Sequence, residues 1–189
     1  MKEVHIFIDL FDKPFSNYDG IFEILKNKNK KILIFSPKSR EYIVNIEHSN
    51  KKFFRFFFYK TLIKEITNFK IQNNLNTNDL KKYLYIDEDS YFSILFFYFF
   101  KNCTKIIIQH GLLTYKISNF NFIIRKIINY LSFKLFHLPI IGYGFGRSSE
   151  DFYLTFTNFE KKFLDSNNIL PCGELIKKSI INYAEQINI

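Results

Sequence analysis

Short apolar runs alternate with helix-like segments along the whole chain, and this alternation limits the possible folds more than any other feature. The apolar runs are rich in β-branched and aromatic residues, which is typical of buried strands. They cover residues 4–10, 31–35, 54–59, 82–86, 104–108, 139–143, 152–157 and 169–173. Because strands that alternate with helices of this length form parallel sheets, we predict an α/β fold with one doubly wound parallel sheet.

Most of these runs are separated by segments in which apolar residues recur at helical spacing. The predicted helices cover residues 16–29, 39–46, 62–69, 91–102, 121–137, 159–167 and 174–186. In the helix over 121–137, one face holds Ile124, Ile127, Ile128, Leu131 and Leu135, and the other holds Arg125, Lys126, Asn129, Ser132 and Lys134. The ordinary arrangement buries the apolar face and exposes the cationic one.

The chain length favours a single domain, since 189 residues can bury one substantial core. We predict that residues 1–173 form this domain and that 174–189 form a C-terminal helix. The net charge of +9 indicates an anionic partner such as a nucleotide, a phosphorylated lipid or a membrane face. A lysine-rich coding bias explains the same charge without any partner.

The sequence predicts a cytoplasmic protein, with a peripheral position on the inner membrane face as the alternative. The start of the chain lacks the basic and apolar regions of a signal peptide. The most apolar stretch, 91–100, is about half as long as a membrane-spanning helix. Cys103 and Cys172 have no metal-ligand spacing, so both are expected to be small buried hydrophobes in a reducing compartment.

The tripeptide Gln109-His110-Gly111 follows the predicted strand 104–108 and is the strongest candidate for chemistry. In an open α/β sheet, ligands bind at the carboxyl ends of the strands, so a histidine there faces a site. Imidazole titrates near neutral pH and can take a proton from a hydroxyl. Gly111 lets a substrate approach the backbone closely. The alternative is a loop histidine with a purely structural hydrogen bond.

Carboxylates follow two other predicted strands at the same edge of the sheet. Asp87, Glu88 and Asp89 come after the strand 82–86, and Asp9 lies at the end of the first strand. We predict that Asp9, Asp87 and Asp89 orient His110 or bind a sugar hydroxyl. The alternative for the triplet is an acidic cluster that complements the dipole of the following helix.

Several familiar site types are absent from the sequence. The glycines in 142–146 lack the spacing and the following helix of a dinucleotide loop. No Walker A motif, nucleophile elbow, metal-ligand set or recognised nucleic-acid motif is present. We therefore predict no cofactor, no metal and no nucleic-acid partner.

The chain resembles GT-B glycosyltransferases of bacterial capsule and lipopolysaccharide biosynthesis and, more distantly, CDP-glycerol glycerophosphotransferases. The resemblance rests on Lys105 to Gly111, Asp151 to Thr157, Glu160 to Leu164 and Ile169 to Gly173. It implies a Rossmann-like domain that forms the N-terminal half of a GT-B fold. It further implies that His110 lies in the cleft between two domains as a general base or acceptor-site residue.

A complete GT-B enzyme has a second Rossmann-like domain that holds the nucleotide donor, whereas this chain stops 16 residues after Gly173. The resemblance therefore implies an acceptor-side half that needs a missing or separate donor domain for activity. The expected partners are a nucleotide sugar and a glycan or lipid-linked acceptor.

Two alternatives belong to other functional classes. The first is a non-catalytic domain that binds the membrane surface through Arg125, Lys126 and Lys134. The second is an independent small-molecule binder or hydrolase, for which the sequence offers no nucleophile or metal-ligand set.

Overall fold

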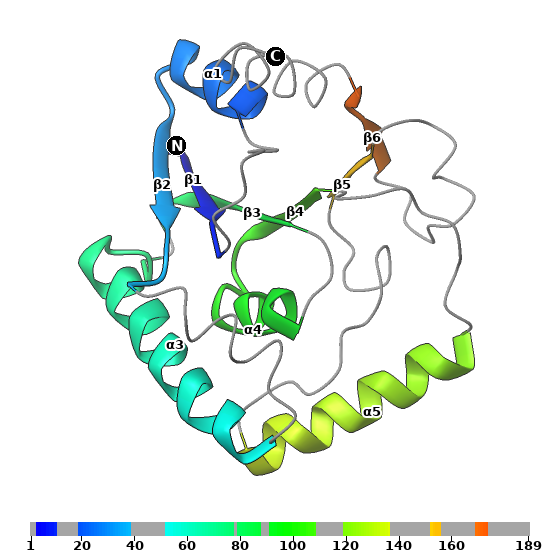
Figure 1. The fold of residues 1–189 in the computed structure, drawn as a ribbon. Coiled ribbons are helices and arrows are strands. Elements are labelled where there is room, and N and C mark those ends of the chain that lie inside the picture. The colour runs from blue at the N-terminus through cyan, green and yellow to red at the C-terminus, as the bar shows by residue number, and fades with distance from the viewer. Residues whose placement is uncertain are drawn as a thin grey trace, which may run out of the picture.

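A computed structural model describes residues 3–10, 19–38, 52–77, 79–87, 91–108, 119–136, 152–155 and 169–173. It contains a six-stranded sheet in which every pair of neighbours is parallel. The strands are β1 (Glu3–Ile8), β2 (Lys31–Phe35), β3 (Lys81–Asp87), β4 (Thr104–Ile108), β5 (Phe152–Thr155) and β6 (Ile169–Pro171). Their order is β2-β1-β3-β4-β5-β6 (Figure 1). The predicted α/β class with a Rossmann-like parallel sheet is confirmed.

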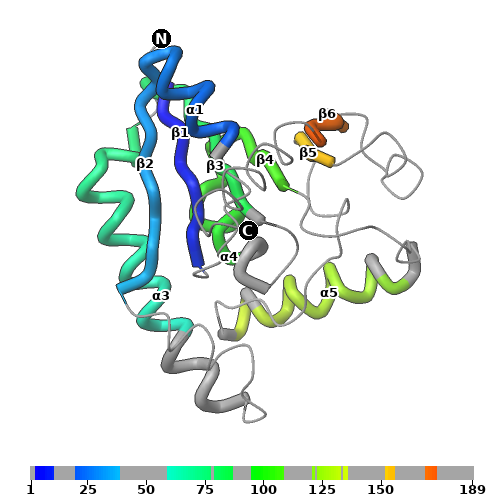
Figure 2. The backbone as a smooth tube through the Cα atoms, turned by 45° about the horizontal axis from the view of Figure 1, so that its top comes forward, coloured from blue at the N-terminus to red at the C-terminus, as the bar shows by residue number. Residues whose placement is uncertain are grey.

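Helices cover both faces of the sheet. The helices of the described residues are α1 (Asp19–Asn27), α3 (Lys52–Gln72), α4 (Tyr91–Phe99) and α5 (Asn119–Phe136). Helix α1 lies on one face, and α3 and α4 lie on the other (Figures 1 and 2). Because successive side chains of a strand point to opposite faces, each strand contributes to two separate core layers.

The larger core layer lies between the sheet and helices α3 and α4. Alternate residues of β1 and β3, such as Ile6 and Leu84, pack there against Leu62, Ile66 and Phe96. The Phe96 ring meets Phe35 edge-on at 5.3 Å between centroids. This arrangement explains why the helix α4 is apolar on nearly all sides, since one of its faces must fill the space above the centre of the sheet.

The smaller layer lies between the sheet and α1. Its centre is Phe7, whose ring stacks on Tyr85 at 4.2 Å and tilts against Phe22 of α1 at 4.4 Å. Leu25 of α1 and Ile108 of β4 complete this layer. The layer continues the period-two pattern of β1, in which Ile6 and Ile8 face the other side.

One predicted strand is wrong, because residues 54–59 belong to helix α3, which runs without a break from Lys52 to Gln72. Tyr59, Leu62 and Ile66 are buried at successive helical spacings of three and four residues. No proline or glycine separates the aromatic run from the helix after it. The dense aromatic residues hide the helical period of this segment. The absence of a turn signal between 54–59 and the following helix was therefore the better indicator of one continuous helix.

The orientation of helix α5 is the second correction. Five apolar residues were predicted to be buried, but Ile124, Ile127, Leu131 and Leu135 are exposed and Ile128 is only partly buried. Asn129 and Ser132 were predicted to be exposed, but their exposed fractions are 0% and 3%. Amphipathic spacing shows that a helix has two different faces, but it does not show which face meets the protein.

Several other predicted elements lie outside the described residues. These are the strand over 139–143 and the helices over 39–46, 159–167 and 174–186. Cys103 is buried as predicted, whereas Cys172 is only partly buried. Its thiol lies 3.4 Å from the carbonyl oxygen of Thr155, and burial raises its pKa to about 11.

His5 of β1 is a buried titratable group in the smaller layer. Its ring stacks on Tyr83 at 4.8 Å, and its Nδ1 forms a 3.0 Å hydrogen bond with the Tyr85 hydroxyl. Its Nε2 is buried and has no hydrogen-bond partner in the described part of the chain. Burial lowers the pKa of His5, because an imidazolium would lose hydration there.

This lowered pKa predicts a loss of stability in mild acid. The unfolded chain takes up the His5 proton near pH 6.5, before the folded protein does, so the contribution is complete above about pH 6.5 and declines below it. The slope attributable to this group is at most about 1.4 kcal/mol per pH unit. In urea unfolding between pH 7.5 and 5.5, the free energy of unfolding should decline less steeply for His5→Phe than for the wild type. Parallel curves for the two proteins would contradict the assignment.

Candidate functional site

The strand order reverses its direction between β1 and β3, the second and third strands of the sheet. From β1 the chain crosses to β2 on one side, and from β2 it returns past β1 to β3 on the other side (Figure 1). In open parallel sheets, ligands bind at the carboxyl ends of the two strands that flank such a switch point. Here these strands are β1 and β3, so their carboxyl ends define the candidate site.

Asp9 is the first residue after β1 and lies at this switch point. Its backbone N–H donates to the carbonyl of Phe35, the last residue of β2, at 2.9 Å. The hydroxyl of Ser36 donates to Asp9 Oδ2 over 3.4 Å. Asp9 is partly exposed, so its carboxylate is held by backbone and side-chain contacts while remaining accessible to a ligand.

Asp87 ends strand β3 at the same level of the sheet. Phe7 pairs with Tyr85, and Asp9 and Asp87 each follow their member of that pair by two residues. The backbone positions of the two aspartates are therefore adjacent at the switch point. The backbones of Asp9 and Asp87 therefore share one edge of the sheet, whereas the predicted roles of their side chains stay predictions.

Strand β4 brings the predicted histidine segment to the neighbouring position. Asp87 pairs with Ile108, the last residue of β4, and Gln109, His110 and Gly111 follow directly in the sequence. Those three residues and Asp89 lie outside the described part of the chain, so their roles stay predictions. The adjacency of β3 and β4, on which the predicted grouping depended, is confirmed.

Ser36 is the candidate site residue that the sequence analysis missed. It follows β2 directly in the segment Ser36-Pro37-Lys38, just beyond the predicted strand 31–35. The signal that could have identified Ser36 is a hydroxyl residue at the carboxyl end of a strand that neighbours β1. Its use required the knowledge that β2 and β1 are neighbours.

A cavity of about 320 Å³ lies at the opposite edge of the sheet. Three lysines contribute to its lining: Lys70, Lys82 and Lys101. The Lys70 ammonium donates to the Phe99 carbonyl at 2.7 Å, and Lys82 donates to the Thr77 carbonyl. The Phe99 carbonyl lies at the C-terminus of α4 and carries partial negative charge, so Lys70 stabilises that end of the helix. The cavity is also remote from the carboxyl ends of the strands, and we assign it no ligand.

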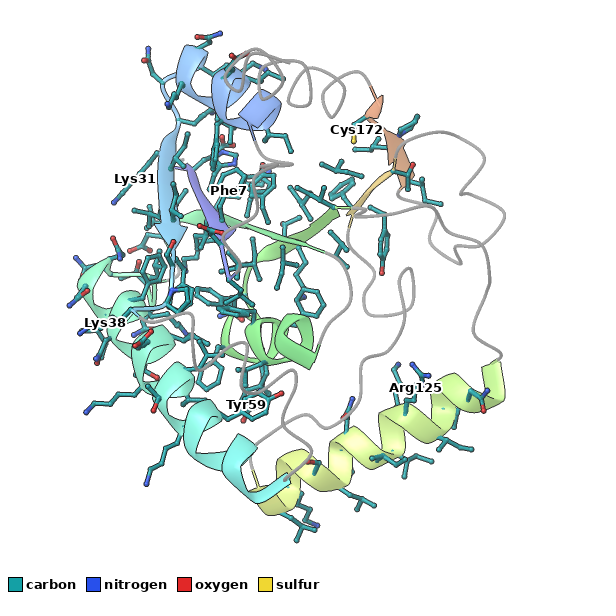
Figure 3. All side chains as sticks on the ribbon, viewed as in Figure 1. Phe7, Lys31, Lys38, Tyr59, Arg125 and Cys172 are labelled. Carbon is teal, nitrogen blue, oxygen red and sulfur yellow. The ribbon has the colours of Figure 1, made fainter. Side chains whose placement is uncertain are left out.

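The three cationic residues predicted to face a membrane do not share one surface. Lys126 and Lys134 of α5 are exposed, whereas Arg125 is partly buried and extends from α5 toward the side that holds the sheet (Figure 3). Of the three, the two lysines are the exposed ones.

Two further observations concern metals and membranes. Within the described ranges, no three His, Cys, Asp or Glu side chains gather in a way that could hold a metal ion. None of the helices in the described part of the chain is long and apolar enough to cross a bilayer.

Comparison of the chain with protein-family models, with curated proteins and with solved structures found no match.

Proposed function

We propose that this chain is the acceptor-side domain of a GT-B-like glycosyltransferase of surface-polysaccharide biosynthesis. The supporting observation is the switch point between β1 and β3, where Asp9 is held by Ser36 and by the end of β2. The strand that precedes the Gln109-His110-Gly111 motif is the next strand of the sheet. The arrangement brings Asp9 and the backbone of Asp87 to one edge of the sheet. In the proposed site the His110 imidazole joins them there, as the transfer chemistry requires.

In the proposed reaction, His110 removes the proton from an acceptor hydroxyl. The acceptor oxygen then attacks the anomeric carbon of the nucleotide sugar and forms the new glycosidic bond. The bond from that carbon to the phosphate oxygen breaks, and the nucleotide leaves with the bonding electron pair. Asp9 and Asp87 bind neighbouring hydroxyls of a glycan or lipid-linked acceptor. A separate donor-binding domain stabilises the leaving phosphate, since this charge stabilisation is a large part of such catalysis.

The proposal is tested by a transfer assay with a panel of nucleotide sugars. The purified chain is assayed alone and together with the protein encoded by the adjacent downstream reading frame. Transfer to a glycan or lipid-linked acceptor in the mixture is the expected result. Absence of transfer and of nucleotide-sugar hydrolysis in both samples, with a folded protein, would contradict the proposal.

A substitution at Asp9 tests the location of the site. We expect Asp9→Asn to lower kcat/KM for the acceptor by about 10- to 150-fold, because one charge-assisted hydrogen bond of about 1.5 to 3 kcal/mol is lost. Asp79→Asn is the matched control, since Asp79 is exposed and precedes the amino end of β3. Equal effects of the two substitutions would exclude the switch point as the acceptor site.

A further inference from the structure

The outward side of α5 is an apolar surface on the outside of the molecule. We define the outer face of α5 as Ile123, Ile124, Ile127, Tyr130, Leu131 and Leu135, whose exposed fractions range from 37% to 69%. Helix α5 lies beyond α4, at the periphery (Figure 2). Several of its side chains project away from the rest of the molecule (Figure 3).

The opposite side of α5 is packed on the protein, so the outer face is exposed although the helix itself is held in place. Asn129 and Ser132 are both buried, and each has an interaction partner. Arg125 is partly buried on the same inward side. The helix therefore packs on the protein through the side that carries Arg125, Asn129 and Ser132, and it presents isoleucine and leucine side chains on the other side. A contiguous exposed apolar surface of this kind marks a site where another protein or a membrane binds.

The charges of α5 indicate which of these partners binds there. All three charged residues of the helix are cationic, and Lys126 and Lys134 are exposed beside the outer face. The whole chain carries a net charge of +9. A second copy of the chain would bring like charges together, whereas anionic phospholipid headgroups would attract them. Lysine side chains can also reach headgroups while their stems lie along buried apolar surface.

The length and composition of α5 agree with an orientation parallel to the bilayer plane. Its 18 residues span about 27 Å at 1.5 Å per residue. The helix is not apolar enough to span a membrane, and its inward side is occupied by the protein. We infer that the outer face of α5 docks on an anionic phospholipid bilayer, with its isoleucine and leucine side chains below the headgroups and Lys126 and Lys134 at the phosphates. This inference does not depend on the proposed transfer chemistry.

Vesicle flotation with the full chain tests the inference. The probes are vesicles of phosphatidylcholine alone and vesicles that also contain phosphatidylglycerol. We expect binding to the anionic vesicles and little binding to the neutral ones. The double variant Ile127→Glu/Leu131→Glu should weaken binding by more than about tenfold, because two apolar anchors are lost. Lys126→Gln/Lys134→Gln should weaken it roughly 30-fold, at about 1 kcal/mol for each lysine.

Matched variants on α3 distinguish docking through the outer face of α5 from a general attraction between a cationic protein and anionic vesicles. Ile71 is an exposed apolar residue there, and Lys60 and Lys64 are exposed cations. Ile71→Glu and Lys60→Gln/Lys64→Gln should leave vesicle binding within about twofold. Equal losses from the α3 and α5 variants would overturn the inference. So would a dimer in sedimentation velocity that Ile127→Glu/Leu131→Glu dissociates, since a second copy would then be the occupant.

Discussion

Replacement of Phe96 by alanine is expected to lower the free energy of unfolding by about 3 to 5 kcal/mol. Phe96 of α4 is fully buried, with an exposed fraction of 0%. Its ring contacts Phe35 and Phe100, at 5.3 and 6.3 Å between centroids. Alanine would remove the transfer free energy of the ring and leave a cavity between α4 and the sheet, which the surrounding side chains fill only in part.

The measurement is urea unfolding followed by circular dichroism. Since domains of this kind are stable by about 5 to 15 kcal/mol in total, the variant should unfold at a much lower urea concentration. Ile71→Ala in α3 is the control, because Ile71 is 59% exposed and should change stability by less than about 0.5 kcal/mol. A Phe96→Ala effect below about 1 kcal/mol would show that α4 does not pack over the centre of the sheet.

Replacement of His110 by alanine is expected to lower the rate of sugar transfer by about a hundred- to ten-thousand-fold, if the transferase activity proposed above is present. Without an imidazole, water must take the proton from the acceptor hydroxyl, and water is a much weaker base. The rate should be measured with saturating donor and acceptor, so that kcat rather than substrate affinity is compared.

Two further measurements separate a catalytic His110 from a loop histidine with a structural hydrogen bond. Added imidazole should restore part of the rate of His110→Ala, because a small base can enter the space that the side chain has left. The wild-type rate should also fall in acid as the imidazole becomes protonated, and this limb should be absent in the variant. Unchanged kcat with a lower unfolding temperature would identify the structural role.

The fold class followed from the sequence because β1, β2, β3 and β4 are short apolar runs bounded by turn residues or helix caps. Their predicted boundaries differ from the observed ones by at most two residues. A strand buried on both faces has to be apolar along its length, so its pattern is local and can be recognised without knowledge of its neighbours. The aromatic run 54–59 is also apolar except for Arg55, and there the same rule predicted a strand that is part of α3.

The candidate site followed from the sequence only in part. Asp9 and Asp87 were recognised because each lies at the end of a predicted strand. Their placement on either side of the switch point depends on the order β2-β1-β3, which pairing between distant segments decides. Ser36 was missed for the same reason, since it reaches Asp9 only because β2 lies beside β1.

The sequence by itself determined the parallel α/β class, the positions of β1 to β4 and the presence of two unlike faces on α5. These features depend on the spacing of apolar residues, which is a local property of the chain. Tertiary structure alone decided that β1 and β3 flank the switch point and that α5 turns its apolar face outward. Both depend on which segments pack together, and the total free energy of packing is not contained in any one segment.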